Sequence, residues 1–225
     1  DLFEMLTGAR LTFSFIVPGG VRRDLPSGFK ERLLKTLDQI ERHLPAIDRI
    51  FVRNPIFVER ARGVGVLSSE DAIKLGVVGP VVRGSGLLCD VRRDAPYGVY
   101  DKVDFEIPTF NEGDSLARWL VRYEEIKQSI SIVRQLVRDI PSGPIARKAP
   151  LVVPKGEAIS RIESSRGETN HYIVGDGSEK PYRVKMNTGS FKNLPALPFL
   201  LKGARIGDMP IIYGSLDYWP VEADR

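Results

Sequence analysis

Cysteine and histidine are scarce in this chain, which has one cysteine and two histidines among its 225 residues. A single thiol, Cys89, excludes a disulfide within the chain and any metal or iron–sulfur site built from its own thiolates. It also favours a reducing compartment. A zinc site is disfavoured as well, because no second histidine or cysteine lies near His43 or His171 in the sequence.

Long apolar runs, a signal peptide and clustered charge are also missing. The longest apolar runs are far too short to span a bilayer. The net charge is +4, but the basic residues are interleaved with acidic ones. This spread predicts a solvated surface suited to an acidic partner, and no nucleic-acid partner. The chain begins at Asp1 rather than Met, as expected of a processed chain or of one piece of a longer chain.

The first part of the chain has the periodicity of helices. The spacing of apolar residues predicts long helices over 29–47 and 114–137, and shorter ones over 1–6, 55–62 and 71–75. Pro45 lies inside the first long helix, where we expect a kink or a break. Asp114 is a suitable N-cap for the second long helix, and Pro141 follows its end. Residues 90–101 contain too many turn-formers for a helix or strand and are expected to form an ordered loop.

After Gly156 the spacing of apolar residues changes from a period near 3.6, typical of helices, to a period of 2, typical of strands. Asp176-Gly177 is a sequence typical of a hairpin turn. A short helix is expected within 191–207, and the apolar run at 209–213 predicts that the closing stretch packs inside. The sequence therefore predicts an α+β fold with one integrated domain. A helical body with long helices covers 1–145, and a small antiparallel β-hairpin layer with a buried closing segment covers 146–225.

Most patterns that could carry chemistry have an ordinary structural explanation. Gly84-Ser85-Gly86 is not followed by the helix that a phosphate-binding loop requires, which argues against a nucleotide site. No Gly-x-Ser-x-Gly elbow is present to support a hydrolase triad. His43 lies on a charged helix face, and His171 in a strand-like run is more typical of a structural histidine than of a ligand.

Arg166 and the closing stretch are the more informative candidates. Arg166 stands at a strand end before a glycine, so a tight turn would present its side chain. If the closing acids are buried, they must pair with one another or with arginines such as Arg166 or Arg83, because an unpaired buried charge is costly. The charged residues of the closing stretch are Asp217, Glu222, Asp224 and Arg225.

Several motifs, in order along nearly the whole chain, resemble one family. They are Gly8-Ala9-Arg10, Pro18-Gly19-Gly20-Val21 with Asp24-Leu25-Pro26, Arg83-Gly84-Ser85-Gly86, Pro96-Tyr97-Gly98-Val99-Tyr100-Asp101, Asp176-Gly177-Ser178 with Pro181-Tyr182-Arg183, and Asp224-Arg225. The family is the large subunit shared by respiratory complex I, where it reduces quinone, and the membrane-bound nickel–iron hydrogenases. The resemblance implies the hydrogenase large-subunit fold. It also implies that this chain is the C-terminal half, without the half that carries the first nickel-binding cysteines or the quinone-site His and Tyr.

The resemblance also implies that nickel is not bound. Hydrogenases of this family place a Cys-x-x-Cys pair where this chain has Trp219 and Glu222, and neither side chain supplies a thiolate. Complex I has a glutamate at the place of Glu222, so this feature resembles complex I. We therefore expect no metal and no cofactor bound by this chain, and an active hydrogenase is the least favoured interpretation.

Two further features differ from complex I. The run from Arg166 to His171 is similar to a hydrogenase segment whose arginine reaches over the metal site, whereas complex I commonly has lysine there. Thr12 stands where many complex I relatives carry a histidine beside the terminal iron–sulfur cluster of the small subunit. The mixture is similar to hydrogenase-derived relatives that lost nickel, such as membrane-bound sulfane sulfur reductases.

The resemblance implies a redox subunit of a membrane-associated, ion-pumping respiratory complex, at the cytoplasmic face of the cell membrane. Its expected partners are an iron–sulfur subunit holding a 4Fe-4S cluster, other peripheral-arm subunits and membrane-arm subunits. Electrons would pass from the cluster to quinone or to a sulfur compound such as polysulfide. The alternative is a catalytically silent subunit that docks the iron–sulfur subunit to the membrane arm. The expected catalytic residues are Arg166, Asp217 and Glu222, the expected cavity-lining residues are Trp219, His171, Arg83, Asp224 and Arg225, and Arg10 and Thr12 are expected near the partner's cluster.

Overall fold

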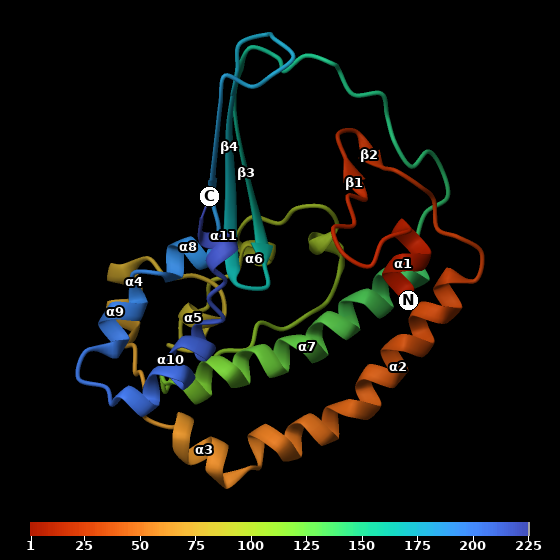
Figure 1. The fold of residues 1–225 in the computed structure, drawn as a ribbon. Helices are drawn as coiled ribbons and strands as arrows, with labels where there is room; N and C mark the ends of the chain where they lie inside the picture. Colours follow the sequence, from red (N-terminus) through yellow and green to blue (C-terminus); the bar gives the residue numbers. More distant parts are fainter. Residues whose placement is uncertain (225) are drawn as a thin grey trace.

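Two long helices and a tall β-hairpin dominate the computed structural model, which describes residues 1–224 (Figure 1). The α-helices are α1 (Leu2–Thr7), α2 (Phe29–Ile47), α3 (Pro55–Ala61), α4 (Ser69–Leu75), α5 (Pro80–Arg83), α6 (Val91–Asp94), α7 (Ser115–Arg138), α8 (Gly189–Asn193), α9 (Ala196–Leu201), α10 (Met209–Leu216) and α11 (Pro220–Ala223). The strands are β1 (Ile16–Val17), β2 (Gly20–Val21), β3 (Gly156–Ser164), β4 (Gly167–Gly175) and β5 (Arg183–Asn187). Single turns of other helix types lie at η1 (Asp48–Val52), η2 (Tyr100–Lys102) and η3 (Ile206–Asp208). Within residues 1–224, every helix is too short or too polar to cross a bilayer.

Helix α2 packs along α7 in the lower body of the molecule (Figure 1). The buried contact between them is made by Leu37 and Leu44 of α2 with Tyr123 and Ile130 of α7. The apolar packing continues past Pro45 through Ile47 and Val52, and the helix runs on to Ile47, so of the expected kink or break the break is wrong. The chain then continues directly into the π-helix η1. Pro45 has no N–H to donate and so interrupts the backbone hydrogen bonds of α2, and a wider π-turn is one way in which a helix adjusts to such an interruption.

Helix α7 is the central element of the fold. Its predicted N-cap is confirmed, since the Asp114 carboxylate accepts a 2.7 Å hydrogen bond from the Ala117 N–H. Besides α2, the helix packs against α5 and α10. The close approach of α5 depends on Gly84, because a Cβ at this position would lie 2.8 Å from the Arg118 side chain. Helix α7 therefore joins the first half of the chain to the closing helices.

The sheet has the order β3-β4-β5, with all pairs antiparallel. The predicted turn after β4 is confirmed, because Asp176-Gly177 lies between β4 and β5. A second, two-residue turn at Ser165-Arg166 joins β3 to β4, since Ser164 pairs with Gly167. A short N-terminal hairpin pairs Ile16–Val17 with Gly20–Val21. The expected loop at 90–101 also differs in detail, since it contains α6 and η2.

The closing stretch is buried on one side only. Ile212, Ser215 and Leu216 of α10 are buried, which confirms the expected internal packing for this helix. Trp219 and Val221 are 53% and 61% exposed, so the expectation of a fully buried end is wrong. The reason is geometric: α11 is a four-residue helix that packs on α8, and a single turn covers only one of its sides.

Candidate functional site

The side chain of Arg166 lies at the tip of the β3–β4 hairpin, against the closing stretch. Its Nε donates a 2.8 Å hydrogen bond to the Asp217 carbonyl and lies 3.4 Å from the Asp217 carboxylate. The Glu222 carboxylate lies 3.5 Å from the same nitrogen, and the guanidinium sits 5.5 Å from the Trp219 ring centroid. We call these four residues the Arg166 group.

Short elements hold the Arg166 group in place. Asp217 is a non-glycine residue with φ 51°, which ends α10 and turns the chain toward α11. Ser190 of α8 donates a hydrogen bond to the Glu222 carboxylate and accepts one of 3.2 Å from the Trp219 N–H. The Thr188 hydroxyl donates to the Glu222 carbonyl at 2.7 Å. The carboxylate of Glu222 is thus oriented by a hydroxyl on one side and an arginine on the other.

The hairpin tip approaches the body at Gly79. This residue has φ 67° and ψ −143°, a conformation open essentially to glycine alone. A Cβ here would lie 2.4 Å from the Gly167 Cα and 2.6 Å from the Arg166 carbonyl oxygen. The position of Arg166 therefore depends on a backbone-to-backbone contact that tolerates no side chain.

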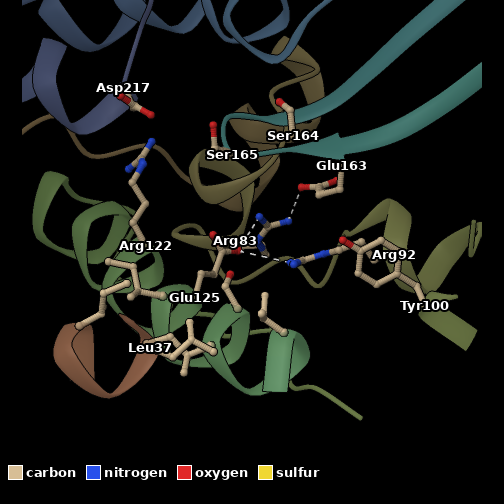
Figure 2. A pocket seen from close by; sticks show the side chains of 15 residues that line it. Leu37, Arg83, Arg92, Tyr100, Arg122, Glu125, Glu163, Ser164, Ser165 and Asp217 are labelled. Atoms are coloured by element: carbon tan, nitrogen blue, oxygen red, sulfur yellow. Dashed lines mark hydrogen bonds and ion pairs between the residues drawn. The ribbon is translucent and has the colours of Figure 1, made fainter. Parts of the chain in front are cut away.

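A cavity of about 580 Å³ lies below the hairpin tip, and Asp217 belongs to both the cavity wall and the Arg166 group (Figure 2). One wall is apolar and comes from α2 and α7: Leu37, Ile40, Ile126, Ile130 and Val133. The other wall is polar and comes from α5, α6, α7, β3 and the hairpin tip: Arg83, Arg92, Arg122, Glu125, Glu163, Ser164 and Ser165. A cavity with two such walls suits a molecule with an apolar body and a polar end.

Part of the polar wall is a closed set of charges, which we call the Arg83 cluster: Arg83, Asp90, Arg92, Glu125 and Glu163. The Arg83 guanidinium is 1% exposed and contacts Asp90 at 3.3 Å, Glu125 at 2.6 Å and Glu163 at 2.9 Å. Arg92 pairs with Asp90 at 2.6 Å. The ordered loop at 90–101 therefore has a clear role, because it brings Asp90 and Arg92 to Arg83.

Burial and pairing shift two pKa values in this cluster. Burial raises the pKa of Glu163 above its ordinary value, although the positive charge of Arg83 opposes the rise. Burial alone would lower the pKa of Arg92, but the hydrogen bond and charge of Asp90 outweigh it and raise that pKa. The cluster has three acids and two arginines, so a Glu163 that binds a proton would bring its charges into balance.

Two further arginines lie one turn apart on α7, and no sequence pattern indicated them. Arg118 is fully buried and donates to Ser215 Oγ, the Gly113 carbonyl, the Gly65 carbonyl and Ser115 Oγ, at 2.9, 2.8, 2.8 and 3.1 Å. Arg122 lines the cavity and donates from Nη1 to the Arg118 and Ser215 carbonyls at 2.9 and 2.7 Å. Burial lowers the pKa of Arg118 to about 9 and that of Arg122 to about 10, so both remain charged at neutral pH.

The structure brings together some of the predicted site residues and separates others. Arg166, Asp217, Trp219 and Glu222 lie together, and Arg83 lines the cavity beside them. His171, Asp224 and Trp219 do not line this cavity, and their predicted place at the acceptor site stays a prediction. His171 pairs with Ser160 and Met186 in mid-sheet, about 13 Å along β4 from Gly167 at 3.3 Å per residue. Asp224 is exposed beyond α11.

Arg10 and Thr12, predicted near a partner's cluster, lie at the surface of the chain. Arg10 is exposed and pairs with Glu4 at 3.0 Å, while Thr12 is exposed with φ 49°. Their place beside a partner's cluster stays a prediction. Arg225, predicted to line the cavity, lies outside the described residues. His43 is exposed on α2, as its charged surroundings indicated.

The donor atoms available here do not fit a nickel–iron centre. Within residues 1–224 no three His, Cys, Asp or Glu side chains lie together in an arrangement that could hold a metal ion. Trp219 and Glu222 offer an indole and a carboxylate, and the one thiol, Cys89, is exposed in another part of the chain. Nickel in such a centre requires thiolates, which these residues do not supply.

The fold and the site define a class: the large-subunit fold shared by nickel–iron hydrogenases and the 49 kDa subunit of complex I, without the thiolates of a nickel site. The chain belongs to the family described as the respiratory-chain NADH dehydrogenase 49 kDa subunit, which matches residues 1–153 and 148–225.

Comparison with individual proteins agrees with the family assignment. A chain of the membrane-bound sulfane sulfur reductase, an archaeal respiratory membrane complex, superposes with a TM-score of 0.95 at 40% identity over 100% of this chain and 63% of that one. A subunit of the F420H2 dehydrogenase of Methanosarcina mazei is 42% identical over 100% of this chain and 62% of its own length. A subunit of the NADH-quinone oxidoreductase of Rhizobium etli is 39% identical over 100% of this chain and 63% of its own length. The chain thus spans a little under two thirds of the length of these relatives.

Proposed function

We propose that this chain is a redox subunit of a membrane-bound respiratory complex of the complex I type, and that it forms part of the site where the terminal electron acceptor is reduced. The observation that carries the proposal is the Arg166 group. A guanidinium is held between two carboxylates beside an exposed indole, and Asp217 connects the group to a cavity with one apolar and one charged wall. The names of the relatives support quinone or a sulfur compound as the acceptor.

The residues of the Arg166 group suit acceptor reduction. A two-electron reduction adds two negative charges to a quinone or to a sulfur–sulfur bond, and these are neutralised by two protons or by nearby cations. The Arg166 guanidinium would stabilise the developing negative charge. The carboxyl groups of Asp217 and Glu222 would orient the acceptor or pass protons to it. Glu222 is suited to this role because Ser190 holds its carboxylate in one orientation.

The electrons would come from a 4Fe-4S cluster held by a partner iron–sulfur subunit, which supplies single electrons when bound. The site on this chain would cover that cluster, with Arg10 and Thr12 near it. Further partners would be the other peripheral-arm subunits and the membrane-arm subunits, and the chain would lie on the cytoplasmic face of the cell membrane. Ion pumping would belong to the membrane arm.

A second function is favoured by one observation. Arg166 already contacts both carboxylates of its group, as expected of a structural ion pair that only holds the hairpin tip to the closing stretch. In that case the chain docks the iron–sulfur subunit to the membrane arm and has no chemistry of its own.

The two functions are separated by reoxidation of the reduced complex. The purified complex is reduced by its donor, and a short-chain quinone and a polysulfide are compared side by side as oxidants. If the acceptor is reduced at this site, at least one of the two oxidants reoxidises the complex at the catalytic rate. Failure of both with the assembled complex would contradict the proposal and support the docking function.

A further inference from the structure

Helix α8 contacts both parts of the chain that supply the Arg166 group. It packs against β4 and against α11, beside the end of the hairpin that carries Arg166 (Figure 1). Glu222 belongs to α11, and Trp219 directly precedes that helix. The position of the guanidinium relative to the Glu222 carboxylate therefore depends on how α8 is joined to each of these segments.

Asn193 joins α8 to the hairpin tip. The side chain is 1% exposed, and both ends of its amide are used. Its Nδ2 donates a 3.1 Å hydrogen bond to the Arg166 carbonyl, and its Oδ1 accepts one of 2.8 Å from the Val78 N–H. Because one partner is an acceptor and the other a donor, a single orientation of the amide satisfies both. Asn193 thus fixes two backbone segments, 27 and 115 residues away in the sequence, relative to each other.

The carbonyl of Arg166 is also the point where two glycines approach the hairpin tip. A Cβ at Gly189 of α8 would lie 2.7 Å from this carbonyl's carbon and oxygen, and a Cβ at Gly79 would lie 2.6 Å from the oxygen. These contacts exclude larger residues, but they do not by themselves hold the carbonyl in one direction. The hydrogen bond from Asn193 supplies that direction, because its strength depends on geometry.

Ser190, three residues before Asn193, makes the other connection. Residues three apart lie on the same face of a helix, and both side chains are 1% exposed. Ser190 donates to the Glu222 carboxylate and accepts a 3.2 Å hydrogen bond from the Trp219 N–H. One short helix is therefore bonded to the backbone of Arg166 through Asn193 and to Glu222 through Ser190.

This connection bears on the chemistry of the site. The Arg166 Nε lies 3.5 Å from the Glu222 carboxylate, and the attraction of a guanidinium for a developing negative charge falls as their distance grows. A shift of about 1 Å in a positioned group is enough to slow a reaction greatly. A residue that holds the Arg166 backbone in place therefore affects the reaction without contacting the acceptor.

We infer that Asn193 is a positioning residue of the acceptor site, which acts through Arg166 by holding its backbone so that the guanidinium stays beside Glu222. This inference rests on the proposed function and deepens it. Asn193 is a positioning residue and not a catalytic one, because its buried amide is fully used by Val78 and Arg166.

The test is a double-mutant cycle between Asn193 and Arg166, measured as turnover per assembled complex with a short-chain quinone and with a polysulfide. Asn193→Asp keeps the shape and the acceptor for the Val78 N–H, but it replaces the donor to the Arg166 carbonyl by an oxygen. Gln135→Glu is the matched control. The Gln135 amide also uses both ends, donating to the Asp104 carbonyl at 2.7 Å and accepting from the Asp104 N–H at 2.9 Å, outside the Arg166 group.

We expect Asn193→Asp to lower turnover by about tenfold or more, and Gln135→Glu by less than about twofold. In an Arg166→Ala background, adding Asn193→Asp should lower turnover by less than about twofold further, because no guanidinium is left to position. A merely structural role would give the same fold-loss in both backgrounds. Asn193→Ser is the second variant, because its short hydroxyl cannot bridge both backbone groups and adds no buried charge. The same pattern is expected for it.

The inference would be overturned by equal losses from the Asn193 variants in the two backgrounds, or by normal turnover of the single Asn193 variants in the assembled complex. In either case Arg166→Ala alone still reports on the proposed function. Normal turnover of Arg166→Ala would contradict the proposed function itself and the inference with it, so the two failures are told apart by this single variant.

Discussion

The Arg83 cluster and the Arg166 group both border the hairpin tip, but they differ in how far their charges are buried and how closely they are paired. In the Arg83 cluster the side chains are 0–16% exposed and are joined by ion pairs as short as 2.6 Å. In the Arg166 group the carboxylates of Asp217 and Glu222 are 41% and 18% exposed, with ion-pair distances of 3.4 and 3.5 Å. The closed cluster fixes the cavity wall, and the open group keeps charges that a ligand can reach.

The largest effect is expected when the closed cluster is broken. Arg83→Met would leave Asp90, Glu125 and Glu163 without their shared cation in a nearly dry site, at a loss of about 3–5 kcal/mol. We expect little assembled complex and a much lower unfolding midpoint. Arg134→Met is the control, because Arg134 also bridges two acids, Asp38 and Glu41, but at the surface. Exposed pairs of that kind contribute about 0–1 kcal/mol. Equal losses in both variants would show that the cluster is not the closed unit described.

A smaller effect is expected when a substitution displaces the hairpin tip but changes no residue of the Arg83 cluster or the Arg166 group. Gly79→Ala would place a methyl group 2.4 Å from the Gly167 Cα and so displace Arg166. We expect reduced turnover in a complex that still assembles, measured as activity per assembled complex. Gly76→Ala is the matched control: Gly76 has φ 64° but no atom within 4 Å of its Cβ position, so it carries only the strain of about 1 kcal/mol. Equal activities in the two variants would contradict the role of the close contact.

Local features were predictable from the sequence. Asp114 acts as a helix N-cap because capping depends on neighbours three residues away. The turn that presents Arg166 follows from a strand ending at a glycine. The helix does not break at Pro45, because the local effect of proline is outweighed by the packing of α2 on α7, which involves residues such as Tyr123 that lie far along the chain.

The site was predictable only in part, for two reasons. The charge of the closing stretch indicated that its acids pair with one another or with an arginine such as Arg166 or Arg83. The family resemblance then selected the members of the Arg166 group as one site, since no local pattern links Arg166 to Glu222. Arg122 was missed because an arginine within a helical stripe is normally a surface residue, and its anchor at Ser215 lies 93 residues away. His171 lies only five residues after Arg166 in the sequence, but the extended strand carries it far from the hairpin tip.

The central claim is that the acceptor is reduced at the open Arg166 group, and turnover of Glu222→Gln in the assembled complex tests it most directly. Glutamine keeps the shape and can still accept from Ser190, but it lacks the charge and the transferable proton. The account predicts a loss of about tenfold or more in turnover, with Arg166→Ala at least as low, while assembly and reduction of the complex by its donor stay normal. Normal turnover of both variants in an intact complex would contradict it.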